Sequence, residues 1–108
     1  MISNFIEIIT TFPDKEEADR ISDYLVRNRF SACCQISGPV TSIYSWDNQM
    51  QKENEYILSI KTRAELFKVI EEEIRKYHPY ETPQIISLDL IDISEPYRIW
   101  LDKNIKYL

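Results

Sequence analysis

A short segment with two prolines, residues 76–86, places the strongest constraint on how this 108-residue chain folds. Proline fixes φ and lacks a backbone N–H, so neither Pro79 nor Pro83 fits inside a regular helix or a central strand. Each proline also moves the residue before it out of the α region. The segment is therefore predicted to be a stiff, extended connector between a helix and a strand. It carries the only histidine of the chain, His78.

Hydrophobic periodicity on either side of this connector predicts strands that alternate with helices. A period of two predicts a strand, and apolar residues three and four positions apart predict a helix. Asp14 and Thr62 are each followed by a glutamate three positions later, so each is predicted to open a capping box at a helix N-terminus. The predicted strands are residues 5–11, 31–46, 56–61 and 85–91, and the predicted helices are residues 14–29, residues 62–77 and a short helix from Ser94.

The order of these elements, β-α-β-β-α-β followed by a short helix, is typical of one α+β fold. Two β-α-β units joined by a hairpin form the split, ferredoxin-like sandwich, in which a four-stranded sheet carries both long helices on one face. Asp47 and Asn48 are predicted to form the hairpin turn, and Gly38 and Pro39 to bend the strand before it. No linker or repeat divides the sequence, so residues 1–108 are predicted to form one domain.

Alternation along the strands assigns side chains to the two faces of this sheet. The helix-covered face is expected to hold Ile6, Ile8, Cys34, Ile36, Tyr56, Leu58, Ile60, Ile86, Leu88 and Leu90. The opposite face is expected to hold Phe5, Glu7, Ile9, Cys33, Gln35, Ile57, Ser59, Lys61, Ser87 and Asp89. The second set is too apolar in its first strand to face water, and a partner subunit is its natural cover. A homo-oligomer is therefore expected.

Composition excludes several classes of function. The formal net charge of −5, with no run of lysine or arginine, argues against a nucleic-acid partner and against an anionic membrane surface. Gly38 is the only glycine, so the chain has no glycine-rich phosphate loop or dinucleotide fingerprint. The N-terminal residues carry no targeting signal, and the adjacent Cys33 and Cys34 cannot close an ordinary disulfide loop. These features indicate a cytoplasmic protein without a membrane partner.

Five motifs in order give the chain a resemblance to a known family. They are Thr10-Thr11-Phe12-Pro13-Asp14, Ala32-Cys33, Ile43-Tyr44-Ser45-Trp46, Ile60-Lys61-Thr62 and His78-Pro79-Tyr80-Glu81-Thr82-Pro83. Together they resemble the CutA divalent-cation tolerance family over nearly the whole sequence. The resemblance implies a ferredoxin-like homotrimer similar to PII signalling proteins, cytoplasmic in bacteria and associated with copper and other divalent metals. It implies no established enzyme activity, and we expect none.

Cys33, His78 and Glu81 are the candidate metal ligands. A thiolate, an imidazole and a carboxylate are ligands that copper accepts, and copper heads the affinity order of first-row divalent ions. The three side chains are predicted to bind copper or another divalent cation, with ligands from one or from several subunits. His78 and Glu81 lack the helical spacing of strong metal motifs, so a purely structural role in the connector is the competing interpretation.

Two other functional classes stay open. In a small-molecule-binding or signalling module, clefts between subunits would be lined by Trp46, Lys61 and Tyr80 with His78 and Glu81, an interpretation supported by analogy with PII proteins. The competing interpretation of Trp46 is a role in subunit contacts. The competing interpretation of Lys61 is a plain ion pair to Glu7 or Asp89. In an enzyme, Cys33 would be the nucleophile and His78 its base, which requires the two side chains within hydrogen-bond reach.

Overall fold

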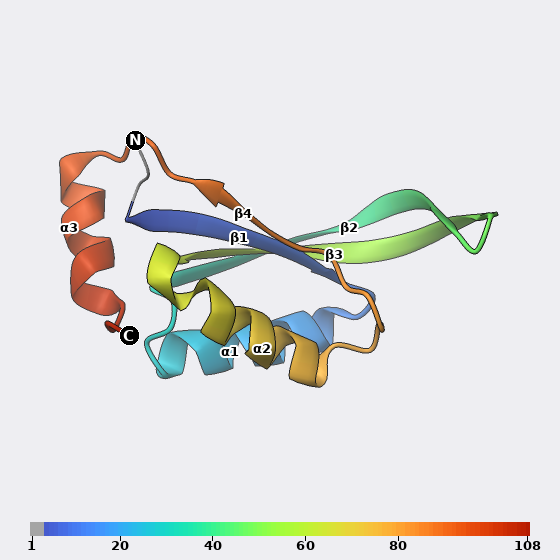
Figure 1. Cartoon of the computed structure of the whole chain (residues 1–108), viewed down its shortest axis with the longest axis horizontal. Helices are drawn as coiled ribbons and strands as arrows, with labels where there is room; N and C mark the ends of the chain where they lie inside the picture. The colour runs from blue at the N-terminus through green and yellow to red at the C-terminus, as the bar shows by residue number, and fades with distance from the viewer. Residues whose placement is uncertain (1–3) are drawn as a thin grey trace.

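Long strands with alternating burial form the sheet that organises this protein. The computed structural model describes residues 4–108, and the N-terminal residues 1–3, which entered the targeting prediction, lie outside that range. The strands are β1 (Phe5–Phe12), β2 (Cys33–Trp46), β3 (Gln49–Arg63) and β4 (Ile85–Asp89). They pair antiparallel in the order β2-β3-β1-β4 (Figure 1). This order and the element sequence confirm the ferredoxin-like fold.

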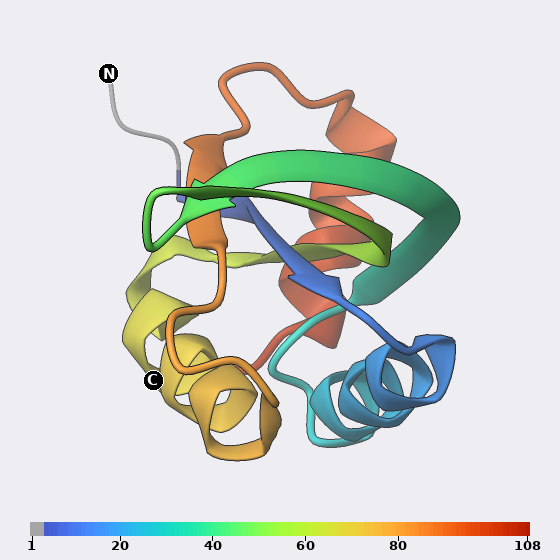
Figure 2. The ribbon, with the colours of Figure 1, turned by 90° about the vertical axis from the view of Figure 1, so that its right-hand side faces the viewer.

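Helices α1 (Lys15–Arg27) and α2 (Phe67–Tyr77) cover the same face of the sheet, as Figure 2 shows end-on. The predicted N-cap of α1 is confirmed, since the Asp14 carboxylate accepts a hydrogen bond of 3.1 Å from the Glu16 N–H. Apolar side chains at helical spacing on α1 and α2 meet alternate residues of the two central strands in the core. That core includes Ile8, Leu58 and Ile60 from the strands and Ala18, Leu25, Ile70 and Ile74 from the helices.

The β2–β3 hairpin is much longer than the rest of the sheet and projects from it as an arm (Figure 1). Asp47 and Asn48 form its turn with φ of 53° and 63°, as predicted from their tolerance of positive φ. The register shifts between Ser37 and Val40, at the predicted bend. Gly38 adopts a φ of +139° there, and a Cβ atom would lie 2.9 Å from the Glu55 carbonyl oxygen, so this position requires glycine.

Helix α3 (Glu95–Asn104) lies at the opposite end of the sheet, and Arg63 holds its C-terminus. The Arg63 side chain is buried and donates to the carbonyl oxygens of Asp102, Ile105 and Lys106 at 2.8–3.1 Å. It also forms an ion pair of 3.0 Å with the Asp102 carboxylate, and this hydrogen bond is the main reason that the pKa of Asp102 is lowered. The carbonyls that end a helix need such donors, and a cation there also complements the helix dipole.

The predicted faces are confirmed for β1, β2 and β3 but are wrong for most of β4. Ile86 lies opposite Ile9, and Leu88 opposite Glu7, so both lie on the face opposite α1 and α2. Each of these two side chains is 47% exposed. The alternate residues Ser87 and Asp89 lie opposite Ile8 and Ile6 on the helix side. Alternation identifies the side of a strand that faces the helices only where packing against those helices is what buries its apolar residues. In the edge strand β4, the apolar residues face away from the core between the sheet and the helices.

The capping box predicted at Thr62 is also wrong, because β3 continues through this segment. Thr62 and Arg63 pair with Ile6 and Phe5 of β1, and the Thr62 hydroxyl donates to the Phe30 carbonyl oxygen at 2.5 Å. A 3-10 turn (Ala64–Leu66) then leads into α2, whose N-cap has no side-chain hydrogen bond. Strand pairing with β1 thus overrides the local capping signal. Tyr77, the last residue of α2, is 57% exposed.

Candidate functional site

The connector begins at His78, whose ring is held by the backbone on both sides. His78 is buried, with Nε2 2.6 Å from the Thr11 carbonyl oxygen and Nδ1 accepting a hydrogen bond of 3.1 Å from the Tyr80 N–H. These partners assign the neutral tautomer with the proton on Nε2. The ring stacks on Phe12 with centroids 4.5 Å apart. Since both nitrogens have partners, the arrangement matches the structural role that competed with metal binding.

Tyr80, two residues further along, connects the connector to β3 through a buried carboxylate. Its hydroxyl donates to Glu55 Oε2 at 3.0 Å, and the Thr11 hydroxyl donates to the same oxygen at 3.4 Å. The Glu55 side chain is buried. Burial raises the pKa of Tyr80 well above its ordinary value, and the Glu55 hydrogen bond and charge raise it further. Tyr80 therefore stays a hydrogen-bond donor at neutral pH.

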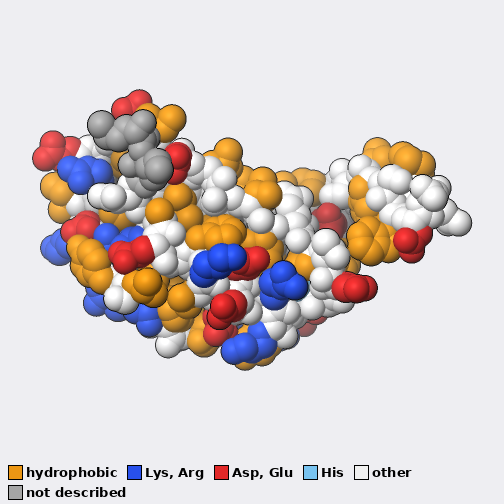
Figure 3. Space-filling view, in the orientation of Figure 1, with side chains coloured by type: hydrophobic (Ala, Val, Ile, Leu, Met, Phe, Trp, Pro, Cys, Tyr) orange, Lys and Arg blue, Asp and Glu red, His pale blue; other side chains and the backbone are white. Residues whose placement is uncertain are grey.

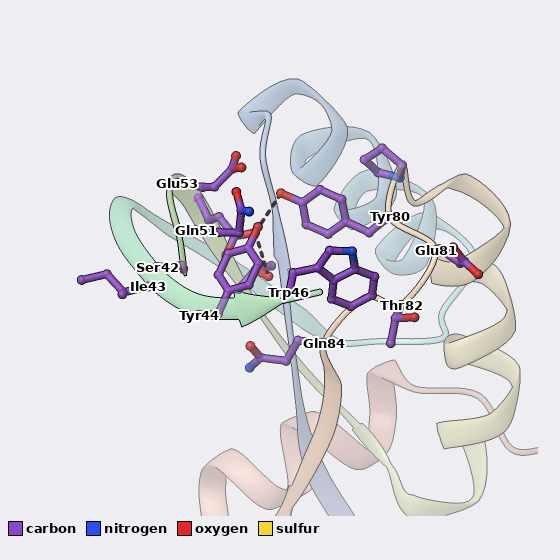
Figure 4. A pocket seen from close by; sticks show the side chains of 13 residues that line it. Ser42, Ile43, Tyr44, Trp46, Gln51, Glu53, Tyr80, Glu81, Thr82 and Gln84 are labelled. Carbon is purple, nitrogen blue, oxygen red and sulfur yellow. Dashed lines mark hydrogen bonds between the residues drawn. The ribbon is translucent and has the colours of Figure 1, made fainter. Parts of the chain in front are cut away.

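Between this connector and the hairpin arm lies a cleft of about 800 Å³ (Figure 4). Its walls combine aromatic rings and carboxylates, with amide and hydroxyl groups between them; the aromatic residues are Tyr44, Trp46 and Tyr80, and the carboxylates are Glu53, Glu55 and Glu81. The lining includes neither lysine nor arginine. The pKa of Tyr44 is raised, first by desolvation and then by the charges of Glu53 and Glu55. The cleft is thus aromatic and electronegative.

Trp46 and Tyr80, predicted to line a ligand cleft, both line this one, together with Glu81 from the predicted metal set. Lys61, the third predicted cleft residue, lies elsewhere on the open face of the sheet. Its ammonium group donates to Gln35 at 3.0 Å and to Ser59 at 2.9 Å, and it lies 3.7 Å from a Glu7 carboxylate oxygen. The ion-pair interpretation of Lys61 with Glu7 is therefore the one the geometry supports.

The two cysteines lie on opposite faces of β2, as their adjacent positions predicted. Cys33 is opposite Lys61 on the open face and half-buried. It lies beside the Tyr97 hydroxyl of α3, whose pKa is raised by burial and then by the Cys33 charge. Cys34 packs against the core, where burial raises the pKa of its thiol to about 11. Only Cys33 is placed to meet a metal ion or a partner subunit.

The predicted ligands Cys33, His78 and Glu81 do not come together within one copy of the chain. Cys33 is aligned, through Lys61, with Glu7 of β1, whereas His78 contacts Thr11 four residues further on, about 13 Å along the strand. Across residues 4–108, no three side chains of histidine, cysteine, aspartate or glutamate converge closely enough to hold a metal ion. The same separation along the sheet keeps Cys33 and His78 out of the hydrogen-bond reach that the nucleophile-and-base mechanism requires.

Sequence reasoning missed Tyr44, Glu53 and Glu55 as members of the cleft. A signal existed, because strand alternation places them on one face of the arm with Trp46: Tyr44 is opposite Gln51, and Glu53 is opposite Ser42. The predicted second strand of the hairpin begins at Tyr56, whereas β3 begins at Gln49. The polar run before Tyr56, which reads as a loop, pairs along its whole length.

No helix within the described part of the chain is long and apolar enough to cross a bilayer. Figure 3 shows charges of both signs mixed over the helices, and hydrophobic side chains both on the body of the molecule and on the projecting arm. Exposed apolar residues of the arm include Ile43, Trp46 and Met50. Part of the exposed apolar surface of this protein therefore lies on the hairpin, next to the cleft.

Comparisons with known proteins agree with these features. The model of the family described as "CutA1 divalent ion tolerance protein" matches residues 6–104. A "probable divalent-cation tolerance protein cutA homolog" of Encephalitozoon cuniculi is 42% identical over 88% of this chain and 82% of its own length. The divalent-cation tolerance protein CutA of Pyrococcus horikoshii is 34% identical over 94% of this chain and 98% of its own.

Solved structures are similar to the same extent. CutA1 from a psychrotrophic Shewanella bacterium superposes with a TM-score of 0.94 at 34% identity, covering 99% of this chain and 100% of that one. CutA1 of Thermus thermophilus superposes with a TM-score of 0.90 at 31% identity, covering 94% and 99% of the two chains. Sequence, topology and superposition coincide over almost the entire length, and the chain therefore belongs to the CutA divalent-cation tolerance family.

Proposed function

We propose that this protein acts in divalent-cation tolerance as a cytoplasmic homotrimer that binds copper or another divalent metal ion. The observation that carries the proposal is the open face of the sheet, where Ile86 and Leu88 are half-exposed beside Ile9. Such a row of apolar side chains is stabilised when a second copy covers it. The same face carries Cys33, so association would bring several thiols to one assembly. Family membership supports the metal function, and the resemblance to PII proteins supports the trimer.

Among the predicted ligands, the structure favours Cys33 and Glu81 over His78. Cys33 supplies a soft thiolate on the surface that a partner copy would cover, and copper prefers such a ligand. Glu81 is exposed at the rim of the cleft. His78 would have to release the Thr11 carbonyl or the Tyr80 N–H before it coordinated a metal ion. A metal site in this protein is therefore proposed to form between copies, around Cys33.

The test is a copper titration against a competing chelator, for Cu(I) and Cu(II) separately, with the oligomeric mass measured in each sample. The native protein is compared with Cys33→Ser, Glu81→Gln and His78→Ala, and Cys34→Ser serves as the matched thiol control. Cys33→Ser is expected to abolish competition with the chelator while the mass of three chains is kept. Equal behaviour of the native protein, Cys33→Ser and Cys34→Ser would contradict the metal site. A stable monomer at micromolar concentration would contradict the homotrimer.

The cleft supports a second candidate function, a PII-like trimeric signalling or small-molecule-binding module without a dedicated metal site. Trp46 and Tyr80 both line it, although they come from the hairpin and from the connector. Clefts with apolar walls and a few polar groups are the usual binding sites of small molecules. Saturable binding of a small molecule that depends on Trp46 would favour this function. The same titration with copper distinguishes it from the first.

A further inference from the structure

We propose that the cleft between the hairpin arm and the connector binds a small organic cation, an ammonium group on an apolar body. The inference rests on the second candidate function, small-molecule binding, and names the chemical class of the ligand. Three aromatic side chains, Tyr44, Trp46 and Tyr80, line one cleft, and Figure 4 shows the Trp46 ring beside Tyr80, with Tyr44 on the hairpin side. The faces of such rings attract cations, and N-methylated ammonium groups are typical guests of several converging rings.

The carboxylates of the cleft have two different roles. Glu55 lies at its base and already accepts hydrogen bonds from the hydroxyls of Tyr80 and Thr11. Glu53 and Glu81 lie on opposite sides of the aromatic group in Figure 4, and within residues 4–108 neither side chain forms a hydrogen bond or an ion pair. These two carboxylates are available to meet an ammonium group. Glu55 contributes negative charge at the base of the cleft, although its Oε2 atom already accepts the hydrogen bonds from Tyr80 and Thr11.

The surroundings argue against two other classes of ligand in this cleft, anions and divalent metal ions. With carboxylates on both sides and no lysine or arginine in its lining, the cleft repels an anion. A divalent metal ion prefers a shell of several oxygen ligands, to which aromatic faces contribute nothing. An organic cation uses both components, because its charge meets the carboxylates and its hydrocarbon part contacts the rings. Trp46 is 48% exposed, so its ring is open to such a contact.

The experiment uses the full-length native protein and follows binding by calorimetry and by tryptophan fluorescence. Choline is the cationic probe, and dimethylbutanol, which has the same shape with carbon in place of nitrogen, is its uncharged control. We expect choline to bind about tenfold more tightly than dimethylbutanol, since cation–π and carboxylate contacts are both lost in the control. Added salt is expected to weaken choline binding and to leave dimethylbutanol unchanged.

Two variants change the cleft without touching the core. Trp46→Leu keeps an apolar side chain but removes the ring, and Glu53→Gln keeps the shape but removes the charge. Each is expected to weaken choline binding severalfold. Trp100→Leu and Glu65→Gln, which change the same residue types outside the cleft, are expected to bind choline like the native protein. The oligomeric mass and the thermal unfolding of each variant are measured to check that the fold and the assembly are retained.

A panel of neutral and anionic aromatic compounds is titrated in parallel, so that the two proposals fail separately. If panel compounds bind in a Trp46-dependent manner while choline does not exceed dimethylbutanol, the organic-cation proposal is overturned and small-molecule binding stands. If neither choline nor any panel compound binds at millimolar concentration, both are overturned, as expected where a neighbouring copy fills the cleft. Choline binding that survives both Trp46→Leu and Glu53→Gln would also overturn the site.

Discussion

Both ends of the sheet bring aromatic rings and carboxylates together, but within residues 4–108 only one of them also has a basic side chain among these groups. At the α3 end, Arg63 lies 3.8 Å from the Tyr107 ring centroid and 5.4 Å from that of Phe5, and it pairs with the Asp102 carboxylate. Aromatic faces and a carboxylate thus already surround a cation. At the hairpin end, the cleft repeats rings and carboxylates, but its lining contains no basic side chain. At the α3 end the chain supplies its own cation, and this arrangement stabilises the fold. At the hairpin end the rings and carboxylates of the cleft have no cation from the described part of the chain.

Removing the cation of the complete end is expected to have the largest effect. Arg63→Met is predicted to lower the free energy of unfolding by about 3 kcal/mol, because it leaves the carbonyls of Asp102, Ile105 and Lys106, at and just beyond the end of α3, without this donor. Chemical denaturation followed by circular dichroism measures the loss. The matched control is Arg98→Met, an exposed arginine of α3, with an expected change within about 0.5 kcal/mol. Equal losses in the two variants would show that Arg63 is not the anchor of α3.

His78 is the second anchor, and it joins the hairpin end to the core. His78→Ala is predicted to lower the free energy of unfolding by about 2 kcal/mol, since a buried carbonyl at Thr11 and the N–H of Tyr80 lose their partners. The same denaturation experiment measures it, with Thr82→Ala in the exposed part of the connector as control. A loss as small as that of Thr82→Ala would instead favour a functional role for the His78 ring.

Much of this fold could be predicted because its signals are local. The strand and helix periods, the Asp14 cap and the Asp47-Asn48 turn each depend on residues within a few positions of one another. Such signals set the order of the elements, and that order with the pairing of sequential strands leaves few topologies. The faces of β1, β2 and β3 followed in the same way, since alternation agreed with burial in these strands.

The errors arose where distant parts of the chain decide the outcome. Pairing of Thr62 with Ile6 keeps that residue in a strand, although its local sequence resembles a cap. Residues Ile86 and Leu88 face away from α1 and α2 because they pair opposite Ile9 and Glu7 of β1, and the pattern within β4 alone does not encode that register. For the candidate site, sequence reasoning identified Trp46 and Tyr80. It could not separate His78 from the cleft, because the partners of His78 are the Tyr80 N–H of the connector and the Thr11 carbonyl of β1.

Tyr80 has both a structural contact and a place in the cleft. Its hydroxyl donates a hydrogen bond to Glu55, and its ring lines the open cleft. Its pKa is raised in the folded protein, so the unfolded chain releases the proton first as pH rises. Its contribution to stability is therefore complete at neutral pH and is lost progressively above about pH 10. Tyr80→Phe is predicted to lower the free energy of unfolding by about 1 kcal/mol at pH 7, and to lose less than the native protein between pH 10 and pH 11.

Denaturation at pH 7, 10 and 11 measures this difference, with Tyr77→Phe as the control, since Tyr77 is 57% exposed and makes no contact with Glu55. Parallel pH profiles for the native protein and Tyr80→Phe, together with a shallower profile for Tyr77→Phe, would assign the alkaline loss to another group. Glu55→Gln adds a second check, because removing the charge beside Tyr80 is expected to lower the tyrosine pKa and move its absorbance transition to lower pH.

The smallest effect on stability is expected at Trp46. This small effect would distinguish the hairpin end from the α3 end, where Arg63 stabilises the fold. Trp46 is 48% exposed at the tip of the arm, whereas Arg63 is 5% exposed. Trp46→Ala is predicted to change the free energy of unfolding by no more than about 0.5 kcal/mol, with the oligomeric mass unchanged. Trp100→Ala is the matched control, because its ring stacks on Tyr97 with centroids 5.5 Å apart and its loss is expected to cost about 1 kcal/mol. A dissociated oligomer in Trp46→Ala alone would assign this ring to subunit contact; an intact oligomer of native stability would mean that the exposed aromatic wall is kept for binding.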